Sequence, residues 1–301
     1  MKLQGHQNIF VVSDLHLGDG SSFDPICKSD RYVQLLHLLD YMDRENGQLV
    51  ILGDLLELWR FSLSSVMNQW HGLLDRFDQM NAIYVLGNHD EKIADIAPDS
   101  TNHPFLKRAC QAFTHKIGDH TFRFMHGHEV DPLIPDPSSL FNGLLRRLSR
   151  PLIPKQQTCL LANDAFSDFL LESGEQMLRI WHRLSRNIHA HLHDELVELF
   201  GEPERTIRRI RTEKMLNRFC HHRDQEYYDI AIAGHTHQAG RFGRWYYNSG
   251  CWTKKTNSFL RIHPDGHVEV FDWDRSGAHP NLEQLGYQQP VLTFEQRTVC
   301  S

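Results

Sequence analysis

Three short apolar runs alternate with two amphipathic helix patterns in the first 90 residues, and this order restricts the fold more than any other feature. The runs cover residues 8–13, 48–52 and 82–86. Residues 32–42 and 66–80 carry apolar side chains at three- and four-residue spacing, which is typical of helices buried on one face. Strands that alternate with helices pair in parallel, so we predict an α/β fold. Polar residues that follow such strands gather at one edge of the sheet, where α/β folds bind ligands.

Residues with metal-binding side chains follow all three runs and two later ones, at 121–125 and 228–233. In chain order these segments are Asp14-Leu15-His16, Gly53-Asp54, Gly87-Asn88-His89-Asp90, His126-Gly127-His128 and Gly234-His235-Thr236-His237. One such segment means little, because it arises easily by accident at a surface or in a core. Five in order, each at the end of an apolar strand, favour a metal site over polar residues that only border a sheet.

The donor atoms of these segments are oxygens and imidazole nitrogens, without thiolates. Such a mixed set suits manganese, iron, cobalt or zinc better than calcium or magnesium, which prefer oxygen ligands alone. Two such ions about 3.5–4 Å apart stabilise both the attacking and the leaving oxygen of a phosphoryl displacement. The glycines beside the ligands let the chain turn sharply at each strand end.

The series resembles the signature of the calcineurin-like metallophosphoesterases over residues 8–130 and 226–272. The resemblance implies a four-layer α/β/β/α core and a dinuclear, metal-dependent phosphohydrolase, with manganese preferred and iron, zinc or cobalt as alternatives. It implies that the first ion is held by Asp14, His16 and His237, the second by Asn88, His126 and His235, and that Asp54 bridges them. His89 then protonates the leaving group and Asp90 orients it. His128 is an alternative to His126, which we favour because it directly follows its strand.

A closer resemblance is to the UDP-2,3-diacylglucosamine pyrophosphatases. It rests on Gly53-Asp54-Leu55-Leu56-Glu57-Leu58-Trp59 and on Tyr247-Asn248-Ser249-Gly250-Cys251-Trp252. It implies a lipid-nucleotide substrate that Trp59 contacts. Two positions depart from that subgroup: His89 replaces its arginine, and His128 replaces the aspartate of its His-Gly-Asp motif. A cyclic-nucleotide phosphodiesterase or a nuclease of the same fold, and a scaffold that has lost catalysis, are therefore kept as alternatives.

Residues 131–225 have long helical patterns, the clearest at 164–200, and we predict that they form a helical cap inserted into the core. The core then covers 1–130 and 226–276, and a C-terminal tail covers 277–301. Arg205, Arg208 and Arg209 belong to a basic stretch of the cap. This stretch suits a substrate diphosphate or an anionic membrane surface, and equally a solvated helical face.

Residues 140–150 form an apolar and basic pattern that fits a membrane interface or an acyl chain, or else an ordinary cap helix. The net charge of -6 argues against a nucleic acid as specific partner, so we expect a phosphorylated small molecule or a lipid nucleotide. Six scattered cysteines indicate reduced thiols, and no targeting or membrane-spanning segment is visible. We therefore expect a cytoplasmic protein with peripheral contact to the inner face of the membrane.

Overall fold

The chain divides into two compact units in the computed structural model. The first unit comprises Met1–Glu129 and His221–Leu285, and the second comprises Val130–Cys220 and Gly286–Ser301. The structure describes Leu3 and residues 7–22, 24–27, 30–94, 103–131, 203–253 and 256–283, with the side chains of 203–214 excepted. The predicted helices at 140–150 and 164–200 lie outside the described residues.

The first unit contains a mixed six-stranded sheet in the order β11-β10-β9-β1-β2-β3. Its strands are β1 (Ile9–Val12), β2 (Gln48–Leu52), β3 (Ile83–Val85), β9 (Asn257–Ile262), β10 (Val268–Asp274) and β11 (Gly277–Pro280). The parallel pairing expected for the first three strands is confirmed, because β1 pairs with β2 and β2 with β3 in parallel. The antiparallel strand β11 extends this sheet into residues that the sequence analysis assigned to the tail.

A mixed five-stranded sheet has the order β4-β5-β6-β8-β7. Its strands are β4 (Ala112–Ile117), β5 (His120–Met125), β6 (Ile230–Ala233), β7 (Gly240–Phe242) and β8 (Tyr246–Asn248). β5, β6 and β8 are parallel, although β5 and β6 are far apart in the chain. The five strands that end in ligand residues therefore belong to two sheets: β1, β2 and β3 to the first, and β5 and β6 to the second.

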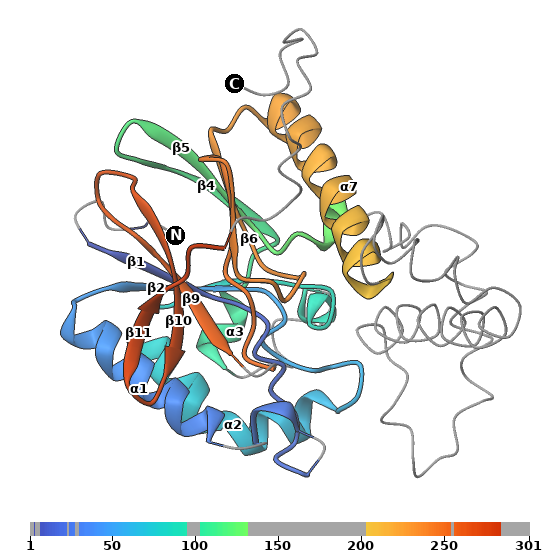
Figure 1. Ribbon diagram of the computed structural model, residues 1–301. Coiled ribbons are helices and arrows are strands. Elements are labelled where there is room, and N and C mark those ends of the chain that lie inside the picture. The colour runs from blue at the N-terminus through green and yellow to red at the C-terminus, as the bar shows by residue number, and fades with distance from the viewer. Residues whose placement is uncertain are drawn as a thin grey trace, which may run out of the picture. The chain divides into compact units, whose positions relative to one another are not determined.

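Two hydrophobic cores lie on opposite faces of the six-stranded sheet. Alternate side chains of a strand point to opposite faces, and in β1 Phe10 packs into one core while Val11 packs into the other. The first core fills the space under helices α1 (Arg31–Arg44) and α2 (Leu63–Gln79), which cover one face of the sheet (Figure 1). The second combines apolar residues of both sheets, such as Val50 and Phe124. Helices α1 and α2, the six-stranded sheet and the five-stranded sheet thus form three successive layers of the predicted α/β/β/α arrangement, and the predicted α/β class is confirmed.

Within the described segments the other helices are short, except for one. They are η1 (Pro25–Cys27), η2 (Glu91–Ile93), α3 (Pro104–Lys107), η3 (His128–Val130) and the long α7 (Pro203–Glu226). The last turn of α7 belongs to the first unit, where the Arg223 guanidinium lies 5.2 Å from the centre of the Trp245 ring. A membrane-spanning helix must be long and apolar, and no helix in the described part of the chain meets both conditions.

Candidate metal centre

The loops that follow the strands are tied to one another by backbone hydrogen bonds. The N–H of Asp14 donates to the Gly53 carbonyl over 3.1 Å, so the ends of β1 and β2 lie together. The N–H of Gly234 donates to the His126 carbonyl over 2.9 Å, which joins the ends of β6 and β5. The N–H of Trp252 donates to the Asp14 carbonyl over 3.1 Å. Ligand segments that are distant in the sequence are therefore held against each other.

The backbone of these loops is unusual for residues other than glycine. Eight such residues in the described segments have positive φ angles, and five of them belong to the ligand set. Those five are Asp14, His16, Asp54, His235 and His237, with φ between 49° and 69°. Left-handed backbone at a residue with a Cβ is uncommon, and it concentrates at functional sites where the surrounding structure enforces it. The chain is bent at each strand end to direct these side chains inward.

The first group of donor atoms comes from Asp14, His16 and His237, which lie within 4.8 Å of one another. The Asp14 Oδ1 atom lies 3.0 Å from His237 Nε2 and 3.9 Å from His16 Nε2. The second carboxylate oxygen of Asp14 accepts a hydrogen bond of 3.0 Å from the His235 N–H. One oxygen of Asp14 is thus used to fix the loop, and the other faces two imidazoles.

The second group comes from Asp54, His126 and His235. The Asp54 Oδ2 atom lies 3.1 Å from His126 Nε2 and 3.8 Å from His16 Nε2, so this carboxylate stands between the two groups. His126 directs Nε2 inward because its Nδ1 donates to the Leu52 carbonyl over 2.9 Å. A backbone acceptor on the far nitrogen is the usual way in which a metal-binding histidine is oriented.

Four buried polar atoms at this place have no hydrogen-bond partner. They are Asp14 Oδ1, Asp54 Oδ2, Asn88 Oδ1 and His126 Nε2. A buried polar atom without a hydrogen bond is costly, and a bound ion or water is a common explanation. All four are oxygen or imidazole donors of the kind that first-row divalent ions accept. The residues present therefore fit a metal centre.

Glycines leave the space that the ligands occupy. A Cβ atom on Gly53 would collide with the His126 ring, and one on Gly87 would collide with the Asp54 carboxylate. A Cβ on Gly234 would lie 2.7 Å from Asp14 Oδ2. The glycines noticed in the sequence thus allow neighbouring strand ends to approach closely, in addition to easing the turns.

Glu57 contacts the His89 ring, whereas the sequence analysis expected Asp90 to orient it. Glu57 Oε1 lies 2.9 Å from His89 Nδ1, while Glu57 Oε2 lies 3.0 Å from His16 Nδ1. The Asp90 carboxylate instead accepts from the N–H groups of Leu55, Leu56 and Gly87 and from the Tyr84 hydroxyl. Asp90 is directed away from the imidazole because it caps these backbone groups, and it shapes the loop between Gly87 and His89.

Trp59 also contacts His89. The two rings are stacked, with centroids 3.8 Å apart and an angle of 24° between their planes. The sequence analysis treated Trp59 as a substrate contact. In the structure its ring also packs against the His89 imidazole. The other predicted substrate contacts, Arg205, Arg208 and Arg209, lie on α7, and their side chains are outside the described part of the chain.

The pKa values of the carboxylates and imidazoles in the candidate metal centre are shifted by their close contacts. Burial raises the pKa of Asp54, but the imidazoles of His126 and His89 outweigh it and hold this pKa well below its ordinary value. In the same way His89 and His16 overcome burial and lower the pKa of Glu57 to about 2. Burial lowers the pKa of His126, yet Asp54 raises it to about 10 when no ion competes for Nε2.

His128 differs from His126 in its surroundings. Its Nδ1 lies 3.4 Å from a carboxylate oxygen of Glu129, and its ring centroid is 5.5 Å from that of His126. Burial lowers the pKa of His128 to about 4, so its imidazole is neutral at pH 7. Among the described residues it does not belong to either three-residue group, whereas His126 does.

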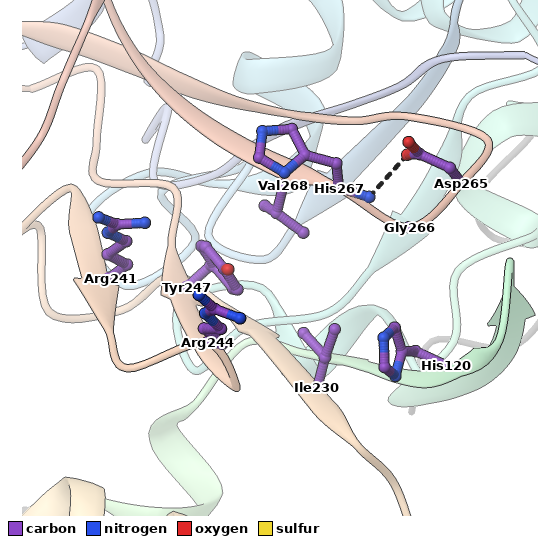
Figure 2. A pocket seen from close by; sticks show the side chains of 9 residues that line it. All are labelled: His120, Ile230, Arg241, Arg244, Tyr247, Asp265, Gly266, His267 and Val268. Atoms are coloured by element: carbon purple, nitrogen blue, oxygen red, sulfur yellow. Dashed lines mark hydrogen bonds between the residues drawn. The ribbon is translucent and has the colours of Figure 1, made fainter.

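A separate pocket of about 390 Å³ lies at the opposite ends of the strands. Its lining includes His120 at the start of β5 and Ile230 at the start of β6, whereas the ligands follow the last residues of these strands (Figure 2). Arg241 and Arg244 lie beside Tyr247 on its other side (Figure 2). The pocket does not contribute to the metal centre.

Glu57 is a candidate site residue that the sequence analysis did not assign. It lies three positions after Asp54, inside a motif that the analysis quoted, so its place in the chain was visible. Its contacts could not be predicted, because the two histidines that it contacts are 41 and 32 residues away in the chain. Only the closure of β1, β2 and β3 into one sheet brings the three side chains together.

Comparison with known proteins gives the class of this chain. The sequence profile of the calcineurin-like phosphoesterases matches residues 7–239, and the chain belongs to this family. Its two mixed sheets with flanking helices are the metallophosphoesterase fold. A search of the curated proteins found no match.

Several solved structures are similar at low sequence identity. A dimetal phosphatase from Danio rerio is 12% identical, with 91% of this chain and 98% of that chain covered and a TM-score of 0.46. Vps29 complexed with zinc from Entamoeba histolytica is 14% identical, with 91% and 97% covered and a TM-score of 0.42. An archaeal phosphodiesterase is 12% identical, with 88% and 99% covered and a TM-score of 0.38.

Proposed function

We propose that this protein is a phosphohydrolase that uses two divalent metal ions. The observation that carries the proposal is the pair of donor groups around Asp54, with four buried polar atoms that have no hydrogen bond. Asp14, His16 and His237 would hold one ion, and His126, His235 and Asn88 the other. Asp54 is suited to contact both because its Oδ2 faces His126 on one side and His16 on the other. The ions would neutralise the charge that develops on the phosphoryl oxygens.

His89 is the proposed proton donor to the leaving group. Its Nδ1 is bound to Glu57, which leaves Nε2 as the nitrogen that faces the centre, 4.0 Å from Asp54 Oδ2. Glu57 is ionised at neutral pH because its pKa is about 2, so it accepts a hydrogen bond from the Nδ1–H of His89 and stabilises the charged imidazole. Trp59 limits rotation of the ring from one face. These contacts prepare His89 to hold a proton at Nε2 and to give it up there.

The proposal is tested by metal content and by hydrolysis of two synthetic substrates, bis(4-nitrophenyl) phosphate and 4-nitrophenyl phosphate. The wild type should hold two ions per chain and hydrolyse at least one substrate. Asp54→Asn should lose both properties, while the exposed control Asp265→Asn keeps them. A protein that binds metal but hydrolyses neither these nor any substrate of a wider panel would instead be a scaffold. Loading with manganese, zinc, iron or cobalt then tests our preference for manganese.

A finer proposal is that the substrate is a lipid nucleotide such as UDP-2,3-diacylglucosamine. Support comes from the motif resemblances around Trp59 and Trp252 and from the basic residues of α7. The family as a whole is broader than this substrate. If the proposal holds, the apolar and basic segment at 140–150 meets the acyl chains, with contact at the inner face of the membrane.

The substrate is tested by comparing UDP-2,3-diacylglucosamine with its deacylated counterpart. The wild type should prefer the acylated compound, and a Leu144→Ser, Leu145→Ser variant should lose the preference while it retains activity on bis(4-nitrophenyl) phosphate. Equal rates on both compounds would exclude the lipid substrate. Cyclic nucleotides and single-stranded DNA in the same panel test the phosphodiesterase and nuclease alternatives.

A further inference from the structure

Another group of possible metal ligands, outside the metal centre, lies on the solvent side of α2. It consists of His71, Asp75 and His103, whose donor atoms lie within 4.8 Å of one another. His71 Nδ1 is 2.9 Å from Asp75 Oδ2, and His103 Nε2 is 3.2 Å from Asp75 Oδ1. The buried face of α2 consists of other residues, such as Trp70 and Leu74, so this group is separate from the hydrophobic core and from the metal centre.

Local structure holds the three side chains in place. His71 and Asp75 are four residues apart on a helix, which makes them neighbours on one face. His103 directly precedes α3, and Phe105 of α3 packs on Phe77 of α2 with ring centroids 5.5 Å apart. Only 3% of the His103 side chain is exposed, so its ring orientation is fixed by packing. Two of the three ligands therefore come from α2, and the third is brought to them by tertiary structure.

The distances are close to those that a tetrahedral ion requires. Zinc binds histidine nitrogen and carboxylate oxygen at about 2.0–2.1 Å, which places adjacent donors about 3.3 Å apart. The two separations from Asp75, 2.9 and 3.2 Å, lie near this value, and each runs to a different oxygen of its carboxylate. The His71 and His103 rings stand at 75° to each other with centroids 5.4 Å apart. About two thirds of the His71 side chain is exposed, so an ion enters directly from solvent.

We propose that His71, Asp75 and His103 bind a third divalent ion of the zinc class. Imidazole and carboxylate ligands suit zinc and its first-row neighbours, and three protein ligands leave a fourth position for water. The ion joins α2 to the segment that begins α3, so its effect is on stability. The simpler arrangement is that Asp75 only accepts hydrogen bonds from the two histidines, and the following measurements separate the two cases.

The test measures zinc in a chain whose metal centre has been disabled by Asp14→Asn and Asp54→Asn. Titration against a chromophoric zinc chelator should show one remaining zinc ion per chain. Adding His71→Ala or Asp75→Asn should remove it, while His37→Ala, an exposed histidine on α1, should not. Zinc should also raise the unfolding temperature of the disabled chain, and this rise should disappear with His71→Ala.

An unchanged zinc content in His71→Ala, or none in the disabled chain, would show that the group is only hydrogen-bonded. If the disabled chain does not fold, the same loss of one zinc ion is measured in His71→Ala in an otherwise wild-type chain. Hydrolysis is not a readout in this test, so its result is independent of the proposed enzymatic function.

Discussion

At the scale of single residues, Glu57 contacts both a proposed metal ligand and the proposed proton donor. One carboxylate oxygen contacts His16, a proposed ligand, and the other contacts His89, the proposed acid. A residue that orients ligands without touching the ion is a positioning residue, and loss of such a residue costs about 10–100-fold in metal affinity or activity. Substrates differ in how much they depend on the His89 proton, so this role can be distinguished from a general effect on folding.

We predict that Glu57→Gln lowers turnover about 10–100-fold without unfolding the protein. The neutral amide has the same shape, but it offers only one acceptor oxygen to two imidazole donors. The rate should fall more for a substrate with an alkoxide leaving group than for a nitrophenyl ester, because the former depends on the His89 proton. Glu45→Gln, an exposed change after α1, is the control. Equal rates for Glu57→Gln and wild type on both substrates would contradict the positioning role.

His89→Ala should leave the metal content unchanged and reduce turnover in a way that depends on the leaving group. General acid catalysis contributes about 10²–10⁴-fold, and a leaving group that departs without a proton needs less of it. Measurement of kcat for an alkyl and a nitrophenyl phosphodiester therefore gives a large loss for the first and a small loss for the second. Equal losses would argue against proton donation, and a loss of bound metal would make His89 a ligand.

At the scale of elements, the strands that carry ligands could be predicted and several that support them could not. Each strand that precedes proposed ligands is an apolar or alternating segment followed by glycine or by ligand-type residues, so its end can be recognised in the sequence. These strands are β1, β2, β3, β5 and β6. β7 (Gly-Arg-Phe) and β8 (Tyr-Tyr-Asn) are as short as β3, but they mix polar and apolar residues and do not lie in an apolar run as β3 does. β11 was assigned to a tail, because its sequence Gly277–Pro280 has no apolar pattern and it forms only by pairing with β10.

The proposed ligands were chosen from the sequence because each lies within four residues after the end of a strand. Their partners could not be predicted, since hydrogen bonds such as those of Asp90 to Leu55 and Tyr84 depend on how the loops fold together. The sequence motif places Asp90 beside His89, but adjacent residues at a turn direct their side chains differently. The contact of Glu57 with His89 Nδ1 could therefore not be read from the motif.

Two glycine-to-alanine substitutions compare the effect of close packing at the site with the effect of helix propensity alone. In Gly87→Ala the new Cβ collides with the Asp54 carboxylate, so we expect a loss of metal binding and a destabilisation of about 1–3 kcal/mol. Gly72 lies in α2 with no atom within 4 Å of the new Cβ, and Gly72→Ala should stabilise the protein by about 1 kcal/mol. Urea denaturation with metal analysis checks both. Equal effects at the two positions would show that Gly87 has no special role.

At the scale of the whole molecule, the metal centre is the place where the ends of both sheets meet. Asp14, Asp54 and Asn88 follow strands of the six-stranded sheet, and His126 and His235 follow strands of the five-stranded sheet. An ion that binds both sets adds to the apolar contacts between the sheets. It also removes the repulsion among buried carboxylates that would otherwise oppose folding. Metal binding and stability of the first unit should therefore be coupled.

The last prediction is that the stabilisation by metal grows as the pH rises from 6 to 9. Asp54 raises the pKa of His126 to about 10 in the metal-free protein, against about 6.5 when unfolded. The protonated imidazole stabilises the metal-free fold fully below pH 6.5, and this contribution is lost as the pH rises through 10. An ion at Nε2 must displace that proton, so metal competes better at higher pH. Burial and the neighbouring Asp54 raise the pKa of Asp90 to about 6, so this carboxyl is ionised over most of the range from pH 6 to pH 9.

The measurement is thermal unfolding at several pH values in the presence of either manganese or a chelator. Metal at 100 times its dissociation constant stabilises by about 2.7 kcal/mol, so the difference in unfolding temperature is readily measured. This difference should widen steadily between pH 6 and pH 9 in the wild type. In His126→Gln it should be smaller and nearly independent of pH, because the displaced proton is absent. A difference in the wild type that stays constant or narrows with rising pH would show that metal binding does not displace a proton from His126.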